Sequence, residues 1–411
     1  MKKIKVHSLT GRITPKLMRQ AFRAVKRNRG AAGVDKVSIR MFEANLEENL
    51  DALMRQLKSR SFRPKPLRRV HISKGPGTKK TRPLGIPVVR DRVAQEVVRR
   101  LLTPVFEPTF HEYSFGFIKD RNCHMAIERV LELHRQGLFV VLDADIQGFF
   151  DTIPHTVIMQ AVAAEVADGN ILGLVERFLT AGVMEDGVYK PTSIGTPQGG
   201  VVSPLLANIV LNHLDWQLHK AGYHFVRYAD DFVVVCQTHR QAQEALELVR
   251  HVLESDLGLQ LSAEKTQITT YGNGYEFLGF FLSSRSRRMR DKSVQKFKAK
   301  IRELTVRKHN LDSKRIEKLN AVIRGTANYF ATSFSTCRWR FQKLDSWIRM
   351  RLRCMKWKRK TYNDNQKLRV EYFRRKLRLL TLEQHCIYRD RHGQARHVIP
   401  RHGATSLGVA R

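Results

Sequence analysis

Three aspartates are the residues whose type and spacing point most directly to chemistry. Asp230 and Asp231 are adjacent in HFVRYADDFVVVC (224–236), where two apolar runs predict short strands joined by a tight turn. Asp145 lies near the end of LFVVLDADI (138–146), an apolar, β-branched run that predicts a buried strand. Carboxylate oxygens suit hard cations, and two Mg²⁺ ions about 4 Å apart can clamp the attacking and leaving oxygens of a phosphoryl transfer. An Asp pair also marks ordinary turns, but unpaired charge above a buried sheet is costly.

A further aspartate on the same strand leaves one assignment open. Asp143 and Asp145 are two residues apart, so both side chains point to the same face of the strand. The spacing alone does not choose which of them joins the Asp pair.

The segments that must position these aspartates predict a compact α+β domain over about 138–282. Its further elements are a helix at 203–222 with Ser203 as its cap, Pro204 in its first turn and Gly222 as its stop, an amphipathic helix at 244–258, and a half-exposed strand at 259–269. Before this domain, the sequence predicts helices in the first 60 residues with a Gly-rich break at 30–35, an extended hairpin at 62–90, and helices at 91–103 and 122–136.

The chain is strongly basic, and the charge is uneven. Its 411 residues carry a formal net charge of +36, and residues 281–380 hold 31 Lys plus Arg against 7 Asp plus Glu. Aromatic and apolar side chains recur there at helical spacing, which predicts helices with one packed and one basic face. So few acids accompany these bases that an anionic partner is expected, although a solvated charged bundle is the alternative. Nucleic acid fits better than a membrane surface, because the charge is not confined to one amphipathic helix.

Other classes of protein are disfavoured by what the sequence lacks. It has no apolar run long enough to span a bilayer, and MKKIKVHSLTGRITPK lacks the apolar stretch of a signal peptide. Five cysteines lie far apart without a CxxC pair, as expected of reduced thiols in a cytoplasmic protein. Residues 382–411 are polar and poorly periodic, which predicts a loose tail.

Several motifs, in order along the chain, resemble those of one enzyme family. RYADDFVVVC resembles the YxDD motif of reverse transcriptases, and GTPQGGVVSPLLANIVLN (195–212) resembles the corresponding segment of bacterial group II intron reverse transcriptase–maturases. The segments that agree are KKTRPLGIPVVRDRVAQ (79–95), YSFGFIKDRN (113–122), DADIQGFFDTIPH (143–155), LSAEKTQI (261–268) and YEFLGF (275–280), and LNAVIRGTANYF (319–330) resembles the maturase-specific region. The paired cysteines of the HNH endonuclease that many relatives carry are not present, so cleavage of a second strand in cis is not expected.

The resemblance implies an α+β right-hand polymerase. Its expected parts are residues 1–137 as N-terminal extension and fingers, 138–282 as a ferredoxin-like palm with the active site, 283–380 as a basic helical thumb or maturase X domain, and 381–411 as a polar tail.

The resemblance also implies roles for individual residues. In the family the metal ligand precedes the second aromatic of the GFF step by five residues, which selects Asp145 rather than Asp143. The implied catalytic residues are Asp145, Asp230 and Asp231, and the implied metal ligands are these three and Ile146. The implied substrate-binding residues are Arg82 and Lys74 at the triphosphate, Phe150 as a gate beneath the sugar, Gln198 at the nucleotide, and Lys265 near the pyrophosphate. Lys79 and Lys80 compete with Lys74, and YEFLGF (275–280) resembles the primer grip.

The implied activity is that of an RNA-directed DNA polymerase. It would extend a DNA primer on an RNA or DNA template with dNTPs and two Mg²⁺ ions, with Mn²⁺ as an alternative. A structured group II intron RNA is the expected further partner, in splicing and mobility, and no membrane partner is expected. Two alternatives stay open: a host-serving relative without an intron, acting in DNA repair or defence, and a protein that is mainly an RNA-binding splicing factor. The oligomeric state is not predicted.

Overall fold

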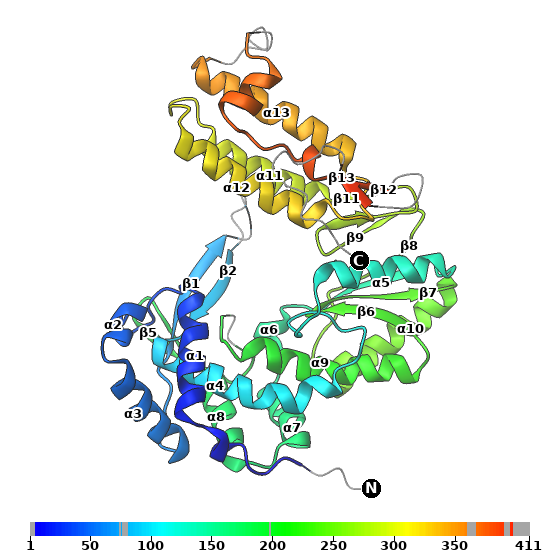
Figure 1. Ribbon diagram of the computed structural model, residues 1–411. Coiled ribbons are helices and arrows are strands. Elements are labelled where there is room, and N and C mark those ends of the chain that lie inside the picture. The colour runs from blue at the N-terminus through cyan, green and yellow to red at the C-terminus, as the bar shows by residue number, and fades with distance from the viewer. Residues whose placement is uncertain are drawn as a thin grey trace, which may run out of the picture. The chain divides into compact units, whose positions relative to one another are not determined.

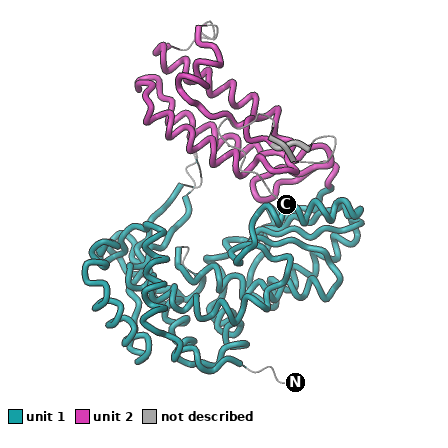
Figure 2. Tube along the Cα trace, in the orientation of Figure 1, with its two compact units in different colours: residues 1–270 teal, residues 271–411 magenta. Residues whose placement is uncertain are grey.

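The computed structural model describes residues 5–73, 75, 81–196, 199–359, 367–389 and 395–397 (Figure 1). The chain divides into two compact units, residues 1–270 and residues 271–411 (Figure 2). Each unit contains both helices and sheets, and the α+β class that the sequence predicts is confirmed.

Helices make up most of the first unit outside its sheets. They are α1 (Pro15–Arg27), α2 (Ile39–Ala44), α3 (Leu46–Lys58), α4 (Val89–Phe106), α5 (Cys123–Arg135), α6 (Phe149–Thr152), α7 (His155–Glu165), α8 (Gly169–Leu179), α9 (Ser203–Lys220) and α10 (His239–His251). The helices predicted in the first 60 residues, at 91–103, at 122–136 and at 203–222 are therefore confirmed, with small shifts at their ends. Ser203 is the first residue of α9 rather than its cap, because Val202 lies at that position.

The sheet that carries the aspartates is antiparallel and has the strand order β6-β7-β3-β8. Its strands are β3 (Val140–Asp145), β6 (His224–Tyr228), β7 (Asp231–Cys236) and β8 (Gln267–Thr270). The buried strand and the hairpin are as predicted. The register sets Asp145 directly opposite Asp231. Directly opposed residues of an antiparallel pair point to the same face, so these two side chains are neighbours.

The two faces of this sheet pack against different helices. Phe232, Val234 and Cys236 of β7 join the main hydrophobic core of the unit, and α10 packs against β3 and β7 (Figure 1). The intervening residues Val233 and Val235 point the other way, and α5 packs against β6 and β7. Asp231 is two residues from Val233, so it lies on the face opposite the main core.

A second sheet in this unit has the order β2-β1-β4-β5. Its strands are β1 (Leu67–Ser73), β2 (Thr81–Ile86), β4 (Val183–Glu185) and β5 (Val188–Lys190). The antiparallel pair of β1 and β2 confirms the hairpin predicted at 62–90 and sets Arg82 opposite Ile72. The parallel pairing of β1 with β4 joins segments far apart in the sequence.

The first described residues are tied to the start of α8. The main-chain amides of Leu9 and Thr10 donate to Asp168 Oδ2 at 2.9 and 2.7 Å, and Val6 pairs with Val166 in a parallel bridge. Burial opposes the ionisation of Asp168, but these and other hydrogen bonds outweigh it and hold its pKa below the ordinary value.

Two predicted elements differ from the structure. The helix predicted at 244–258 begins earlier, at His239, because the Thr238 side chain caps it by accepting from the amide of Gln241. After His251 the chain continues as a π-helical turn, Val252–Asp256. The strand predicted at 259–269 is confined to β8, because the amides of Lys265 and Thr266 bond to the carbonyl of Ser262 and make a turn there.

The second unit is mainly helical, which confirms the prediction for residues 281–380. A sheet of order β11-β10-β9 precedes the long helices. The elements of the second unit are β9 (Tyr275–Phe277), β10 (Phe280–Leu282), β11 (Arg287–Met289), α11 (Asp291–Leu304), α12 (Ser313–Phe330), α13 (Arg338–Lys356), a π-helical turn (Tyr372–Lys376), a 3₁₀ turn (Glu383–His385), β12 (Ile387–Arg389) and β13 (Ala395–His397). On α13 the apolar residues Leu344, Ile348, Leu352 and Met355 recur at helical spacing and are buried, and Trp347 among them is partly buried.

Residues 382–386 pack against α13, so the loose tail predicted for 382–411 is wrong for this segment. Asp345 of α13 accepts hydrogen bonds from the amides of Leu382 and Glu383 at 2.8 and 3.0 Å. Burial raises the pKa of Asp345 to about 6. Leu382 is fully buried. None of the helices in the described part of the chain has the length and apolar character needed to cross a membrane.

Candidate active site

The hairpin of β6 and β7 brings the Asp pair to the sheet end where Asp145 lies. Ala229 in its turn adopts a left-handed conformation with φ +59°, and Asp230 follows it. Asp231 then opens β7 opposite Asp145. The three aspartates that the sequence predicts to be catalytic therefore meet at one end of the sheet.

Asp230 lies where a negative charge is costly. Burial raises its pKa above the ordinary value, and the neighbouring Asp145 carboxylate raises it further, whereas Lys265 and Arg227 lower it. A divalent cation would relieve this repulsion, so the donor set fits the chemistry of Mg²⁺.

The described side chains do not form a ready-made metal cage. No group of three or more His, Cys, Asp or Glu side chains among them could hold a metal ion. The predicted ligand Ile146 is buried, and the only oxygen it offers is its main-chain carbonyl. A cation at this place would therefore draw the carboxylates of Asp145, Asp230 and Asp231 together.

Lys265 is bound to one of these carboxylates. Its Nζ lies 2.7 Å from Asp145 Oδ2, and the two side chains are 64% and 41% exposed. The amide of Ser262 also donates to the carbonyl of Asp145 at 2.8 Å, which holds the loop of Lys265 beside β3. The family resemblance implies that Lys265 lies near the pyrophosphate. In the structure, Lys265 instead contacts Asp145, a candidate metal ligand. Such an exposed ion pair contributes little to stability, so a cation or a phosphate can displace it.

Asp143 has different neighbours from Asp145. Its register partners are Val233 on β7 and Gln267 on β8, and the Gln267 side-chain amide donates to its carboxylate at 3.3 Å. The register thus favours Asp145 over Asp143 as the partner of the Asp pair.

A buried arginine lies behind the turn. Arg227 is fully buried, and its Nε and Nη2 donate to the two carboxylate oxygens of Asp215 at 2.7 and 2.5 Å. Its Nη1 donates to Asn208 Oδ1 and to the carbonyl of Ala229, both at 2.9 Å. Asp215 and Asn208 belong to α9, so this network fixes the carbonyl just before Asp230 to a helix.

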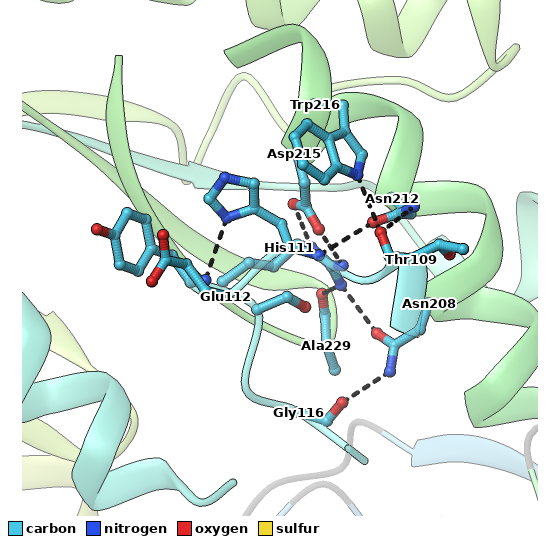
Figure 3. A network of polar contacts seen from close by, with 12 residues as sticks. Thr109, His111, Glu112, Gly116, Asn208, Asn212, Asp215, Trp216 and Ala229 are labelled. Atoms are coloured by element: carbon cyan, nitrogen blue, oxygen red, sulfur yellow. Dashed lines mark hydrogen bonds and ion pairs between the residues drawn. The ribbon is translucent and has the colours of Figure 1, made fainter. Parts of the chain in front are cut away.

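The segment 113–116 closes the network on its other side (Figure 3). The Asn208 side chain donates to the carbonyl of Gly116 at 2.7 Å, and main-chain hydrogen bonds join both sides of Arg227 to this segment. A Cβ on Gly116 would lie 2.3 Å from the amide nitrogen of Ala229. Only glycine therefore permits so close an approach of the two backbones.

The same helix also holds the preceding loop. The side chains of Asn212 and Trp216 donate to the carbonyl of Thr109 at 3.2 and 3.0 Å, and Asn212 accepts from the amide of His111 at 3.3 Å (Figure 3). α9 thus serves as a frame for the loop and for the turn.

Sequence reasoning misses Arg227, Asp215 and Asn208, although a signal for them exists. Arg227 stands in an apolar strand and Asp215 in an apolar helix. Charged residues are almost never fully buried unless they are paired. Two such charges of opposite sign in neighbouring elements therefore indicate a buried ion pair.

The two phenylalanines of the GFF step have different environments. Phe149 is 2% exposed and belongs to the core, whereas Phe150 is partly exposed. The centroids of the two rings are 5.2 Å apart. The carbonyl of Phe150 accepts from the amide of Thr196 at 2.7 Å. The start of the GTPQGG segment is therefore fixed to α6.

The structure describes only some of the predicted nucleotide-binding residues. Arg82 is exposed on β2, in a different sheet from the aspartates. Lys74, Lys79, Lys80 and Gln198 lie outside the described residues.

Comparisons with known proteins found matches over most of the chain. Residues 72–282 match the family model "Reverse transcriptase (RNA-dependent DNA polymerase)", and residues 294–377 match "Group II intron, maturase-specific domain". The chain is 35% identical to protein YkfC of Escherichia coli over 306 residues, which cover 64% of this chain and 80% of YkfC. It is 30% identical to the group II intron-encoded protein LtrA of Lactococcus lactis over 298 residues, which cover 57% of this chain and 49% of LtrA, about half its length. One chain of a solved structure, a partial Cas6-RT-Cas1–Cas2 complex, is 22% identical to this chain with a TM-score of 0.37. The match covers 59% of this chain and 40% of that one.

Proposed function

The chain belongs to the group II intron reverse transcriptase and maturase family, and we propose that it extends a DNA primer on an RNA or DNA template with dNTPs. The observation that supports this best is the register of Asp145 opposite Asp231, with Asp230 in the adjoining turn. Carboxylates gathered at one sheet end offer the hard oxygen ligands on which metal-assisted phosphoryl transfer depends.

Two Mg²⁺ ions, with Mn²⁺ as a substitute, are the proposed cofactors. Asp145, Asp230 and Asp231 would hold them through their carboxylates, and Ile146 through its main-chain carbonyl. Such ions, when bound, stabilise negative charge on the attacking and leaving oxygens. The proposal is supported by the raised pKa of Asp230, because a buried carboxylate beside another gains from a nearby cation.

The other predicted site residues are proposed to bind the dNTP. The Arg82 guanidinium would hold the triphosphate through paired N–H groups, with Lys74 beside it, and Gln198 would contact the nucleotide. The partly exposed ring of Phe150 would exclude a 2′-hydroxyl by steric clash. Lys265 Nζ, an exposed ammonium beside Asp145, would give a proton to the leaving pyrophosphate.

The second unit is proposed to bind structured intron RNA and so to assist splicing. Its charge supports this, since residues 281–380 carry a net charge of +24. Affinity for RNA should then fall by orders of magnitude between low and moderate salt, because each neutralised phosphate releases counterions. A flat salt response would contradict this role.

Primer extension on an RNA template tests the polymerase proposal. Joint replacement of Asp230→Ala and Asp231→Ala should reduce the rate roughly a thousandfold or more, because metal ligation supplies several kcal/mol of transition-state stabilisation. Asp51→Ala, on an exposed position of α3, is the control and should leave the rate unchanged. Polymerisation by the double variant at the wild-type rate would show that the assignment of these aspartates is wrong, whereas assistance to splicing should survive the same change.

Crosslinking of the protein to RNA in its native cells, followed by sequencing, tests the intron role. One dominant structured RNA that contains the protein's own message would support an intron-encoded maturase. A broad spread of cellular RNAs would instead favour a host-serving reverse transcriptase, and the maturase role would fall.

A further inference from the structure

A groove lies between α11 and the first turns of α13 in the second unit. Its volume is about 440 Å³, within the roughly 300–1,000 Å³ of sites that bind small organic molecules. Lys298 and Arg302 line it from α11, and Trp339, Arg340 and Lys343 line it from α13. On α13, Lys343 lies four positions after Trp339 and three after Arg340, so its side chain is a neighbour of both on the helix surface.

The groove is strongly cationic. Asp291 is the acidic residue in its lining, and its carboxylate accepts from Arg340 Nη1 at 2.6 Å. That ion pair leaves Lys298, Arg302 and Lys343 as positive charges without a carboxylate in the lining. Three like charges around one groove repel one another, and an anion would relieve the repulsion.

Trp339 gives the groove an aromatic surface. Its side chain is 64% exposed, and the Nζ of Lys343 lies 3.6 Å from the ring centroid. Two turns further along α13, Trp347 is approached by Lys298 and Arg302, at 5.5 and 5.6 Å from its centroid. An indole is a large apolar group, and one that stays in water beside cations suits a flat ligand that carries negative charge.

We propose that this groove binds an unpaired nucleotide of an RNA strand, with its base stacked on Trp339 and its phosphates on Lys298, Arg302 and Lys343. The inference rests on the proposed RNA-binding role of the second unit and names the form of RNA that this surface recognises. A paired base hides its faces in the helical stack, so an aromatic platform selects single-stranded loops, bulges and ends. The groove thus adds a preference for unpaired RNA to an attraction by charge.

Fluorescence anisotropy tests this preference with an oligouridine of about ten nucleotides. The same strand paired to its complement, and the DNA strand of the same sequence, are measured at the same salt. Trp339→Ala should weaken binding of the single-stranded RNA roughly tenfold to hundredfold and change duplex binding little, because stacking of one base on an aromatic ring accounts for a loss of that size. Trp339→Phe, which keeps an aromatic face, should retain most of the affinity.

The chain offers matched controls for both kinds of side chain. Trp357 is also exposed and has a lysine over its ring, but it does not line the groove, so Trp357→Ala should leave binding unchanged. Lys300 lies on α11 outside the groove and pairs with Glu303, so Lys300→Ala should weaken binding less than Lys298→Ala.

A crosslinking experiment locates the base directly. Irradiated oligouridine that carries 5-iodouridine should crosslink to the peptide that contains Trp339. Crosslinks elsewhere, equal losses for single strand and duplex in Trp339→Ala, or an unchanged affinity would each overturn the proposal. Tighter binding of the DNA strand would overturn its assignment to RNA. Primer extension by the wild-type chain is run in parallel, since its failure would end the polymerase proposal without affecting the result for the groove.

Discussion

Arg227 and Asp215 form a fully buried ion pair behind the turn that carries Asp230. The pair is bidentate, and the remaining donor of the guanidinium reaches Asn208 and the carbonyl of Ala229. The strand that ends at the turn is thereby attached to α9 by side chains as well as by packing. We infer that this attachment positions Asp230.

Arg227→Lys should therefore reduce polymerase activity more than it reduces the affinity for dNTP. Lysine keeps the charge, but it lacks the planar fork that reaches both Asp215 and Ala229. We expect kcat to fall tenfold or more and KM for dNTP to stay within a few-fold, as measured by steady-state primer extension. Arg250→Lys, at an exposed pair with Glu247, is the control.

A double replacement separates positioning from stability. Removing one partner of a buried pair costs about 3–5 kcal/mol, whereas apolar residues of similar size at both positions are often tolerated. The double replacement of Asp215→Leu and Arg227→Met should thus restore most of the free energy of unfolding that either single replacement loses, without restoring kcat. Recovery of both would mean that the arginine has only a structural role.

Gly116→Ala should distort the same turn from the other side. The new Cβ would lie 2.3 Å from the Ala229 nitrogen, which is main chain and cannot rotate away. We expect a loss of polymerase activity together with a loss of roughly 1–3 kcal/mol in the free energy of unfolding. Gly11→Ala, with nothing within 4 Å of its added Cβ, should change neither quantity appreciably.

Phe149 and Phe150 should respond differently to truncation. Phe150→Ala should raise the use of ribonucleotides relative to deoxyribonucleotides tenfold to hundredfold, a range typical of discrimination by pocket shape. Phe149→Ala should instead lower stability by about 3–5 kcal/mol, because that ring is in the core. Single-nucleotide incorporation and urea denaturation measure the two effects, and an unchanged ribonucleotide preference in Phe150→Ala would exclude the gate.

Lys265→Gln should lower the Mg²⁺ concentration needed for half-maximal activity by a few-fold. The lysine ammonium competes with metal for the Asp145 carboxylate, and exposed ion pairs of this kind are worth only about 0.2–1 kcal/mol. The rate at saturating Mg²⁺ should nevertheless fall if Nζ gives its proton to pyrophosphate. Lys265→Arg keeps the charge and should leave the Mg²⁺ requirement unchanged, and an unaltered requirement in Lys265→Gln would contradict the competition.

Asp345 should make the protein less stable as the pH rises through 6. Its pKa is raised to about 6 by burial, so between about pH 4 and pH 6 the folded chain holds a proton that the unfolded chain has lost. Stability from this group is present below its unfolded pKa and is lost above the folded one, on the order of 3 kcal/mol in all. Urea denaturation from pH 4.5 to 7.5 should show this slope in the wild type and a flatter one in Asp345→Asn, and parallel curves would refute it.

Local patterns predicted much of the fold and one part of the site. The apolar strand before Asp145 and the hairpin around Asp230 were predictable because alternation and turn chemistry act over a few residues. The pairing of β1 with β4 depends on contacts between distant segments that no local pattern encodes. The contact of Lys265 with Asp145 depends on the turn at Ser262, which interrupts an apparently continuous alternation of apolar and polar residues. Arg227 shows a further limit, since a charged residue in a strand reveals that a partner is needed but not which one.

The attachment of Leu9 and Thr10 to Asp168 also bears on how the chain folds during synthesis. The acceptor is made about 160 residues after its donors, which at the usual speed of a ribosome is a delay of roughly 10 to 30 s. During that time the N-terminal segment has no native partner at this position, although α1 can already form. Leu9 and Thr10 are thus translated well before Asp168 and reach their final place only after it is made.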